Sequence, residues 1–217
     1  MTTPSPPAAA SDRLADHFAG RGIHYGWVVV AVTFLTMLVT AGAVGAPGVL
    51  IDPLRAEFGW ATADISSAFA IRLVLFGLMG PFAAAFLNRF GLRRVTAVAL
   101  SLIAAGVLGS VFMTELWQLL LLWGLVVGIG TGLTAMVLGA TVATRWFVAR
   151  RGLVMGLLTA STATGQLVFL PLLAHLTESV GWRSALFAVL AMILVAALAV
   201  LALMRDRPAD VGLTPYG

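Results

Sequence analysis

Long apolar runs, separated by short polar stretches, follow one another along nearly the whole sequence. A helix of about 20 residues, rising ~1.5 Å per residue, crosses the ~30 Å hydrocarbon layer of a membrane. Runs of this kind occupy residues 25–50, 65–87, 95–113, 116–140, 152–174 and 184–204. In lipid, backbone groups must be hydrogen-bonded inside their own segment, and the runs show no strand-like alternation. The sequence therefore predicts an all-α membrane protein with six transmembrane helices and the lipid bilayer as its first partner.

The composition excludes a water-soluble fold and several classes of function. Charged residues make up 10% of the chain and hydrophobic ones 60%, whereas soluble domains have about 25% charged residues. The net charge of +4 comes from arginines scattered between apolar runs, so no basic patch for nucleic acid is expected. The absence of cysteine rules out disulfides and thiolate metal ligands. No protease, nucleotide-binding or haem-binding motif occurs, and we predict no enzyme activity, no metal and no cofactor.

Residues 1–24 differ in character from the rest of the chain. They are rich in proline and alanine, carry charges of both signs and show no hydrophobic periodicity, so we expect a flexible cytoplasmic tail. The run at 25–50 is longer than the about 7–15 residues of a signal-peptide core, which predicts an uncleaved first helix. The six-helix transmembrane bundle is therefore predicted at 25–204.

The distribution of arginine predicts the orientation in the membrane. Ten arginines fall in the tail, in the second and fourth connections or after the last run: Arg13, Arg21, Arg89, Arg93, Arg94, Arg145, Arg150, Arg151, Arg205 and Arg207. Only Arg55 and Arg183 fall in the first and fifth connections, and Arg72 lies inside a run. Because cytoplasmic loops carry an excess of positive charge, we predict a multi-pass protein of the cell's inner (plasma) membrane with both termini cytoplasmic.

Small residues recur every four positions in the fourth and fifth runs. The rows are Gly124, Gly128 and Gly132, and then Gly152, Gly156, Ala160 and Thr164. Such rows allow two helix backbones to approach closely. They are typical of ordinary helix packing, and they also suit helices that rock against each other.

The second connection contains a recognisable signature. It ends in Asn88-Arg89-Phe90-Gly91-Leu92-Arg93-Arg94, which resembles the signature between helices 2 and 3 of the major facilitator superfamily. Arg89, Gly91 and Arg93 match that signature, and Arg94 extends it. In the family this loop is a latch between the two halves of the transporter. Ala84 replaces the first glycine of the motif, and Asn88 replaces its aspartate, which leaves an amide in place of a charge.

Other motifs resemble one branch of that superfamily, the branch of monocarboxylate and oxalate/formate transporters. They are the stretch Arg145-Trp146-Phe147 with Arg150-Arg151-Gly152, the opening His24-Tyr25-Gly26-Trp27, and Phe58-Gly59-Trp60. The resemblance implies the amino-terminal half of such a transporter, built as two inverted repeats of three helices. Residues 205–217 would be the start of the cytoplasmic linker. The second six-helix half would be missing from this chain, supplied in trans, or replaced by a second copy.

Arg72 is the candidate substrate-binding residue with the strongest physical case. A buried arginine within a membrane span costs at least about 2.5 kcal/mol, and its forked guanidinium suits a carboxylate. The alternative is a side chain that reaches the outer interface. Four uncharged polar residues complete the predicted substrate site: Thr36, Thr40, Thr131 and Gln166. For each threonine the alternative is a hydrogen bond to a carbonyl of its own helix.

These observations predict secondary transport of a small solute, an organic anion such as a monocarboxylate, by alternating access. The alternative is a half-domain remnant or a membrane scaffold that transports nothing. The sequence leaves open the substrate, the direction of transport and the coupling ion. It also leaves open whether the chain is a fragment of a twelve-helix protein or a half-size protein.

Overall fold

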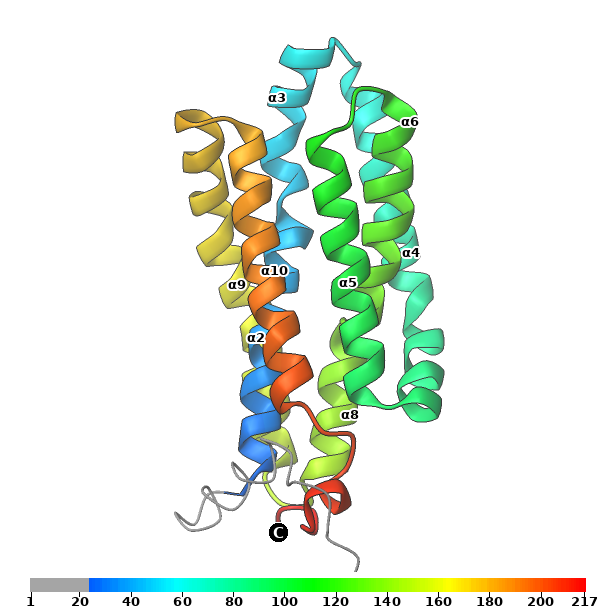
Figure 1. Cartoon of the computed structure of the whole chain (residues 1–217), viewed down its shortest axis with the longest axis vertical. Helices are drawn as coiled ribbons and strands as arrows, with labels where there is room; N and C mark the ends of the chain where they lie inside the picture. Colours follow the sequence, from blue (N-terminus) through cyan, green and yellow to red (C-terminus); the bar gives the residue numbers. More distant parts are fainter. Residues whose placement is uncertain (1–23) are drawn as a thin grey trace, which may run out of the picture.

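The computed structural model describes residues 24–217 and has six spans long and apolar enough to cross a membrane. Figure 1 shows them as one upright bundle. The spans are α2 (Gly26–Gly45) with α3 (Pro47–Phe58); α4 (Thr62–Phe90); α5 (Leu92–Val111); α6 (Leu116–Leu119) with η1 (Leu120–Val127), α7 (Gly128–Leu133) and α8 (Met136–Trp146); α9 (Arg151–Ser179); and α10 (Trp182–Leu203). A short 3₁₀ helix, η2 (Pro208–Val211), follows. The predicted tail lies outside the described residues, apart from His24.

The six predicted helices are confirmed, but several are longer than their apolar runs. The first span continues to Phe58 rather than residue 50, and the fourth continues to Trp146 rather than residue 140. These extensions carry charged side chains, with Arg55 and Glu57 on α3 and Arg145 on α8. A helix does not have to stop where the hydrocarbon stops, because its backbone hydrogen bonds are internal at any depth. The apolar runs therefore predicted which parts of the chain cross the membrane, but not where the helices end.

The first and fourth spans are each interrupted. In the first, α2 passes into α3 at Ala46 and Pro47, where proline has no N–H to continue the helix. In the fourth, a π-helical segment leads into α7, and Ala135 then adopts an extended conformation before α8 begins. Ala46 and Ala135 lie at nearly the same distance from the starts of their spans, which makes the two interruptions equivalent.

The packing of the helices follows the predicted inverted repeats. The first span packs mainly against α9 and α10, while the fourth span packs mainly against α4 and α5, and α5 meets α10 in the middle. Exchanging spans 1 with 4, 2 with 5 and 3 with 6 reproduces this pattern. Exchanged spans also run in opposite directions, as an axis in the membrane plane requires. The bundle is therefore two three-helix repeats in inverted topology, which is half of a major facilitator fold.

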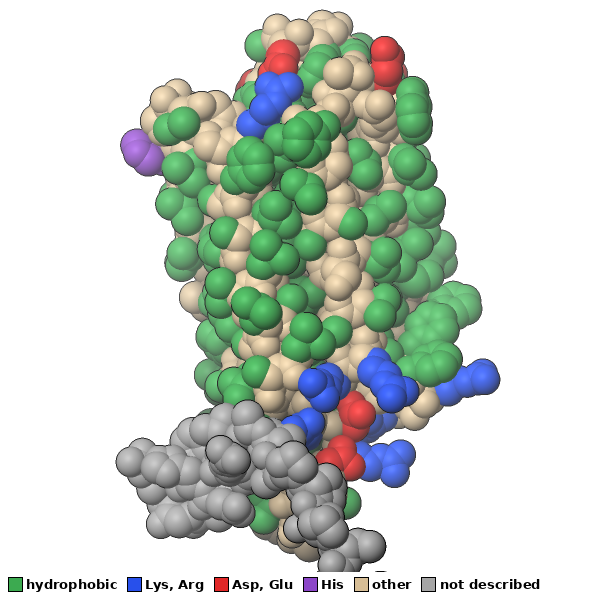
Figure 2. All heavy atoms as spheres, viewed as in Figure 1, with side chains coloured by type: hydrophobic (Ala, Val, Ile, Leu, Met, Phe, Trp, Pro, Cys, Tyr) green, Lys and Arg blue, Asp and Glu red, His purple; other side chains and the backbone are tan. Residues whose placement is uncertain are grey.

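Burial divides the bundle into a closed centre and two exposed flanks. The largest fully buried side chains include Trp123, Trp146, Tyr25 and Phe147. The helices α4 and α9 lie on opposite sides of the bundle in Figure 1. These two helices and α10 have the smallest shares of buried residues among the six spans. Their exposed side chains are mostly apolar, as Figure 2 shows for the face it presents. Such a surface suits contact with lipid or with another set of helices.

Candidate functional site

Arg72 is buried inside the second span, with 4% of its surface exposed. One guanidinium nitrogen, Nη2, donates a hydrogen bond to the carbonyl of Val44, at 3.1 Å. The other two, Nε and Nη1, are buried and have no hydrogen-bond partner among residues 24–217. The ion pairs of the described residues join Arg55 with Asp52 and Arg183 with Glu57, so no acidic side chain in that part of the chain neutralises Arg72. The alternative of a side chain that reaches the outer interface does not hold here.

The glycine row of the fourth span explains how α4 can approach so closely at Arg72. An added Cβ at Gly128 would lie 3.3 Å from the Cα of Arg72, and one at Gly132 would lie 2.5 Å from the Cβ of Met79. This row therefore packs as predicted. The row of the fifth span does not, because Gly152 and Gly156 are exposed and an added Cβ there meets nothing within 4 Å.

Two of the three predicted threonines are satisfied within their own helices. The Thr36 hydroxyl donates to the carbonyl of Val32 at 2.9 Å, and the Thr131 hydroxyl donates to that of Val127 at 2.8 Å. Both residues are fully buried. A threonine in a helix can bond the carbonyl one turn earlier, as both residues do here. In this structure they lie among the helices of the bundle and line no open cavity. Thr40 is also buried, but its hydroxyl has no hydrogen-bond partner in the described part of the chain.

Gln166 lies on the exposed face of α9. Its neighbour Gly165 packs against the first span, where an added Cβ would be 2.4 Å from the carbonyl oxygen of Leu38. Arg72 is on α4, on the other flank of the bundle (Figure 1). The structure therefore keeps Gln166 apart from Arg72, while Val44 places the first span next to Arg72.

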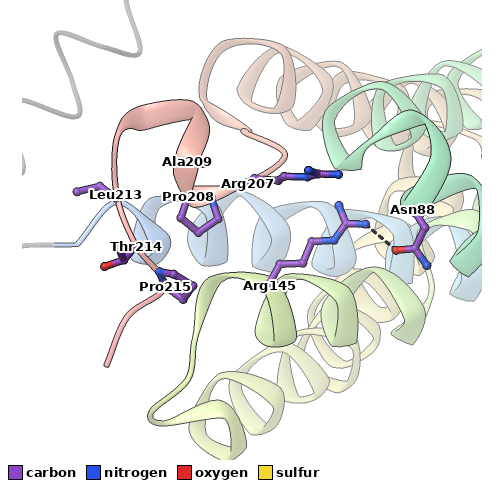
Figure 3. A pocket seen from close by; sticks show the side chains of 8 residues that line it. All are labelled: Asn88, Arg145, Arg207, Pro208, Ala209, Leu213, Thr214 and Pro215. Atoms are coloured by element: carbon purple, nitrogen blue, oxygen red, sulfur yellow. Dashed lines mark hydrogen bonds between the residues drawn. The ribbon is translucent and has the colours of Figure 1, made fainter.

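The predicted latch residue Asn88 has a partner at the arginine-rich end of the bundle, defined as the end where α4, α8 and α10 finish. The side-chain oxygen of Asn88 accepts a hydrogen bond from Nη2 of Arg145 at 2.7 Å, as Figure 3 shows. The same nitrogen donates to the carbonyl of Leu87 at 3.0 Å. An amide here thus binds an arginine of the fourth span without a charge pair.

Gly91 and Arg93 contact an acidic residue that the sequence did not single out. The backbone N–H of Arg93 donates to Oδ1 of Asp206 at 2.8 Å, and its guanidinium contacts the carbonyl of Leu201. Gly91 has a φ of +90° at the start of α5, and an added Cβ there would lie 2.5 Å from Oδ2 of Asp206. A carboxylate is favourable at a helix N-terminus. The one available signal was an acid placed between Arg205 and Arg207.

Residues 205–217, which we name the C-terminal strap, cross the arginine-rich end and join two motifs that lie far apart in the sequence. The backbone N–H of Tyr216 donates to the carbonyl of Trp146 at 2.8 Å, and that of Val148 donates to the carbonyl of Tyr216 at 2.9 Å. The ring of Tyr216 lies 5.8 Å from that of Phe147 and 5.5 Å from that of His24. The opening motif and the fourth-connection motif therefore meet on the strap. A cavity of about 610 Å³ between the strap and the bundle is lined by Asn88, Arg145, Arg207, Pro208, Ala209, Leu213, Thr214 and Pro215 (Figure 3).

At the opposite end of the bundle, the carboxylate of Glu57 connects several helix ends. Glu57 accepts hydrogen bonds from the indole of Trp182 at 2.6 Å and from Nη1 of Arg183 at 3.0 Å, and it pairs with Nη2 of Arg183 at 2.7 Å. Nε of Arg183 donates to the carbonyl of Val111. This group joins the first, third and sixth spans at the end opposite to the arginine-rich end.

Comparison with known proteins agrees with this geometry. The sequence profile of the Major Facilitator Superfamily matches residues 32–216. Monocarboxylate transporter 9 of Mus musculus is 32% identical over 172 residues, which cover 78% of this chain and 33% of that protein. Monocarboxylate transporter 11 of Mus musculus is 31% identical over 163 residues, covering 75% of this chain and 36% of that protein. The chain thus spans about a third of the length of these curated relatives.

A solved structure shows the same fold. The crystal structure of a D-xylose–proton symporter matches with a TM-score of 0.70 and 17% sequence identity, over 84% of this chain and 49% of that chain. The predicted resemblance to the monocarboxylate transporter branch is confirmed by the relatives, and the six-helix fold corresponds to about half of the symporter. The chain belongs to the major facilitator superfamily.

Proposed function

We propose that this chain forms one half of a secondary transporter for small organic anions, such as monocarboxylates, and that Arg72 binds the carboxylate. The observation that carries the proposal is the buried guanidinium of Arg72, which has two nitrogens without partners. A buried charge without compensation is costly. A carboxylate would supply two acceptor oxygens in the geometry that a guanidinium fork requires.

The interruption of the first span offers a way for substrate to reach Arg72. Among the described residues, Arg72 has one hydrogen-bond acceptor, the carbonyl of Val44. This carbonyl lies just before the break at Ala46 and Pro47. Movement at that break would free the guanidinium, and the unpartnered hydroxyl of Thr40 lies one helical turn before Val44. We include Thr40 in the proposed site on this basis. Thr36 and Thr131 already have local acceptors, and we leave them out.

A second six-helix half is part of the proposal. Alternating access in this superfamily is largely the rocking of one half against the other. The exposed flanks of α4 and α9, including Gln166, would face that half, whether it follows in the same polypeptide, acts in trans or is a second copy. The latch residues Asn88, Arg89, Gly91, Arg93 and Arg94 would lie at the cytoplasmic face of the plasma membrane, since the arginine-rich end is the inner one by the positive-inside rule.

The test is uptake of radiolabelled monocarboxylates into vesicles that contain the chain, with and without a second half from a monocarboxylate transporter. We expect uptake only with the second half. In that complex, Arg72→Gln should lower uptake by a factor on the order of 30, because charged hydrogen bonds contribute about 2 kcal/mol. Arg72→Lys should keep part of the activity, since lysine retains the charge but not the fork.

Arg55→Gln is the matched control, because Arg55 is an exposed arginine paired with Asp52 only at 3.7 Å. Its uptake should equal that of the unmodified chain. Unchanged uptake with Arg72→Gln would remove Arg72 from the substrate site. Absence of uptake with every second half tried would favour the alternative of a remnant or scaffold.

A further inference from the structure

Two arginines of the family signature take no part in the contacts described above. Arg89 and Arg94 are exposed, and neither forms a hydrogen bond or ion pair with another described residue. The guanidinium of Arg89 lies over the ring of Phe90, 5.4 Å from its centroid. Asn88, Gly91 and Arg93 have partners within the chain, so these two cations are left available for a different ligand.

Arg94 lines an apolar groove between α4 and α5. The groove has a volume of about 340 Å³ and is lined by Phe86, Phe90, Arg94, Val95, Val98 and Leu133. Phe86, Phe90 and Val98 are 40%, 47% and 56% exposed and form its walls. Val95 and Leu133 are nearly buried and form its floor. Figure 2 shows hydrophobic side chains gathered over the lower end of α4, with basic side chains beside them.

We propose that this groove binds an acyl chain of an anionic phospholipid, and that Arg94 and Arg89 bind its phosphate. The apolar walls run from Arg94 along about one helical turn to Val98, about 6 Å at ~1.5 Å per residue. An acyl chain leaving a headgroup at the arginines would enter the hydrocarbon along this path. The guanidinium fork fits phosphate oxygens. A phospholipid combines an apolar chain with a phosphate, which matches both the apolar walls and the cations.

Net negative charge should matter for binding at this site. A basic residue close to a membrane surface favours anionic over neutral lipid by about fivefold. The proposal requires only that the bundle lies in a membrane, and it does not depend on anion transport. Its failure and that of the proposed function are therefore separable.

The experiment is native mass spectrometry of the purified chain, titrated with phosphatidylglycerol or phosphatidylcholine carrying the same acyl chains. We expect one phosphatidylglycerol to bind at least fivefold more tightly than phosphatidylcholine. Arg94→Gln combined with Arg89→Gln should reduce this preference to less than twofold, and Arg94→Lys alone should preserve most of it. Val98→Trp should weaken the binding of both lipids, because the indole would occupy the groove.

Val195→Trp is the control for added bulk. Val195 is 59% exposed on α10, the repeat counterpart of α5, at a similar distance from the arginine-rich end. Val195→Trp should not change the affinity for phosphatidylglycerol or for phosphatidylcholine. The thermal unfolding midpoint of each variant verifies that it is folded. Equal affinities for the two lipids, or a preference that survives both the double arginine variant and Val98→Trp, would overturn the proposal. So would a dimer that Val98→Trp dissociates, because the groove would then be a contact between copies.

Discussion

The helices α4 and α9 occupy equivalent places in the two inverted repeats. Each has 29 residues and contains one interior proline in its last third, Pro81 in α4 and Pro171 in α9. Each packs against the interrupted span of the other repeat. The two helices differ at the position where α4 carries Arg72. Counted from the first residue of each helix, the equivalent position in α9 is Ser161.

Ser161 is as buried as Arg72, but it has no unsatisfied donor. Its hydroxyl donates to the carbonyl of Leu158 at 2.6 Å. The same architectural position therefore accepts a small, self-satisfied side chain in one repeat. The fold therefore does not require a cation at this position, which agrees with the binding role that we propose for Arg72. A buried cation that the fold does not require is a candidate for ligand binding, because its burial is costly.

The contact of α4 with the fourth span and the contact of α9 with the first span use small residues in opposite ways. Against α4, the glycines belong to the partner span, with Gly128 facing the backbone of Arg72. Against the first span, the glycine belongs to α9 itself, where Gly165 faces the carbonyl of Leu38. A bulkier residue on α9 should therefore disturb the second contact directly.

The largest effect is expected from Gly165→Val. The nearest obstacle to a new Cβ is backbone, at 2.4 Å from the Leu38 oxygen, and cannot rotate away. Overpacking of this kind costs about 3 kcal/mol or more. The same change at Gly156, on the same helix, meets nothing within 4 Å and should alter stability by less than about 0.5 kcal/mol. Denaturant unfolding in detergent measures both. Similar losses for the two variants would mean that α9 does not contact the first span through Gly165.

A smaller effect of opposite sign is expected from Arg72→Met. Replacing a buried, unneutralised charge with an unbranched apolar side chain should stabilise the isolated chain by about 2 kcal/mol. Ser161→Ala should change stability by only about 0.5 kcal/mol, because its hydrogen bond to Leu158 lies within α9. Thermal unfolding in detergent without substrate compares the two. Destabilisation by Arg72→Met would show that the guanidinium holds the repeat together, and the contrast with Ser161 would be lost.

The smallest effect is expected from Pro81→Ala and Pro171→Ala. Each change restores one helix N–H, and each proline is exposed. The gain in unfolding free energy should be about 1 kcal/mol. This is well below the ~3 kcal/mol that a proline costs inside a soluble helix, because membrane helices adapt to proline. If the two helices are equivalent, the two changes in unfolding free energy should agree within experimental error. Opposite signs would show that the two prolines have different structural roles.

The sequence predicted the spans well, because length and continuity of an apolar run are sufficient to identify a membrane helix. It predicted the repeats only through family resemblance. It missed the extent of α3 and α8, because a helix at the interface can carry charges such as Glu57 and Arg145 without ending. The π-helical segment of the fourth span also had no signal, since its residues are as apolar as their neighbours.

The candidate site could be predicted only in part. The cost of Arg72 was evident from its position, but its contact with Val44 joins two spans and depends on how they pack. The threonines were identified by polarity, while their partners are local carbonyls that polarity does not reveal. Asp206 reaches the start of α5 from the strap, a short polar segment without periodicity. Contacts made by such segments depend on the folded surface beneath them.

The C-terminal strap also determines how the bundle would bear a mechanical load. The bond from Tyr216 to Trp146 and the bond that it accepts from Val148 fasten the strap to the turn between the fourth and fifth spans. A force applied at Gly217 would reach this turn before it reached α10. The few hydrogen bonds and ring contacts of the strap would then rupture first, and α10 would carry tension only after the strap had detached. Under such a load, the contacts of the strap would therefore break before the sixth span is stretched.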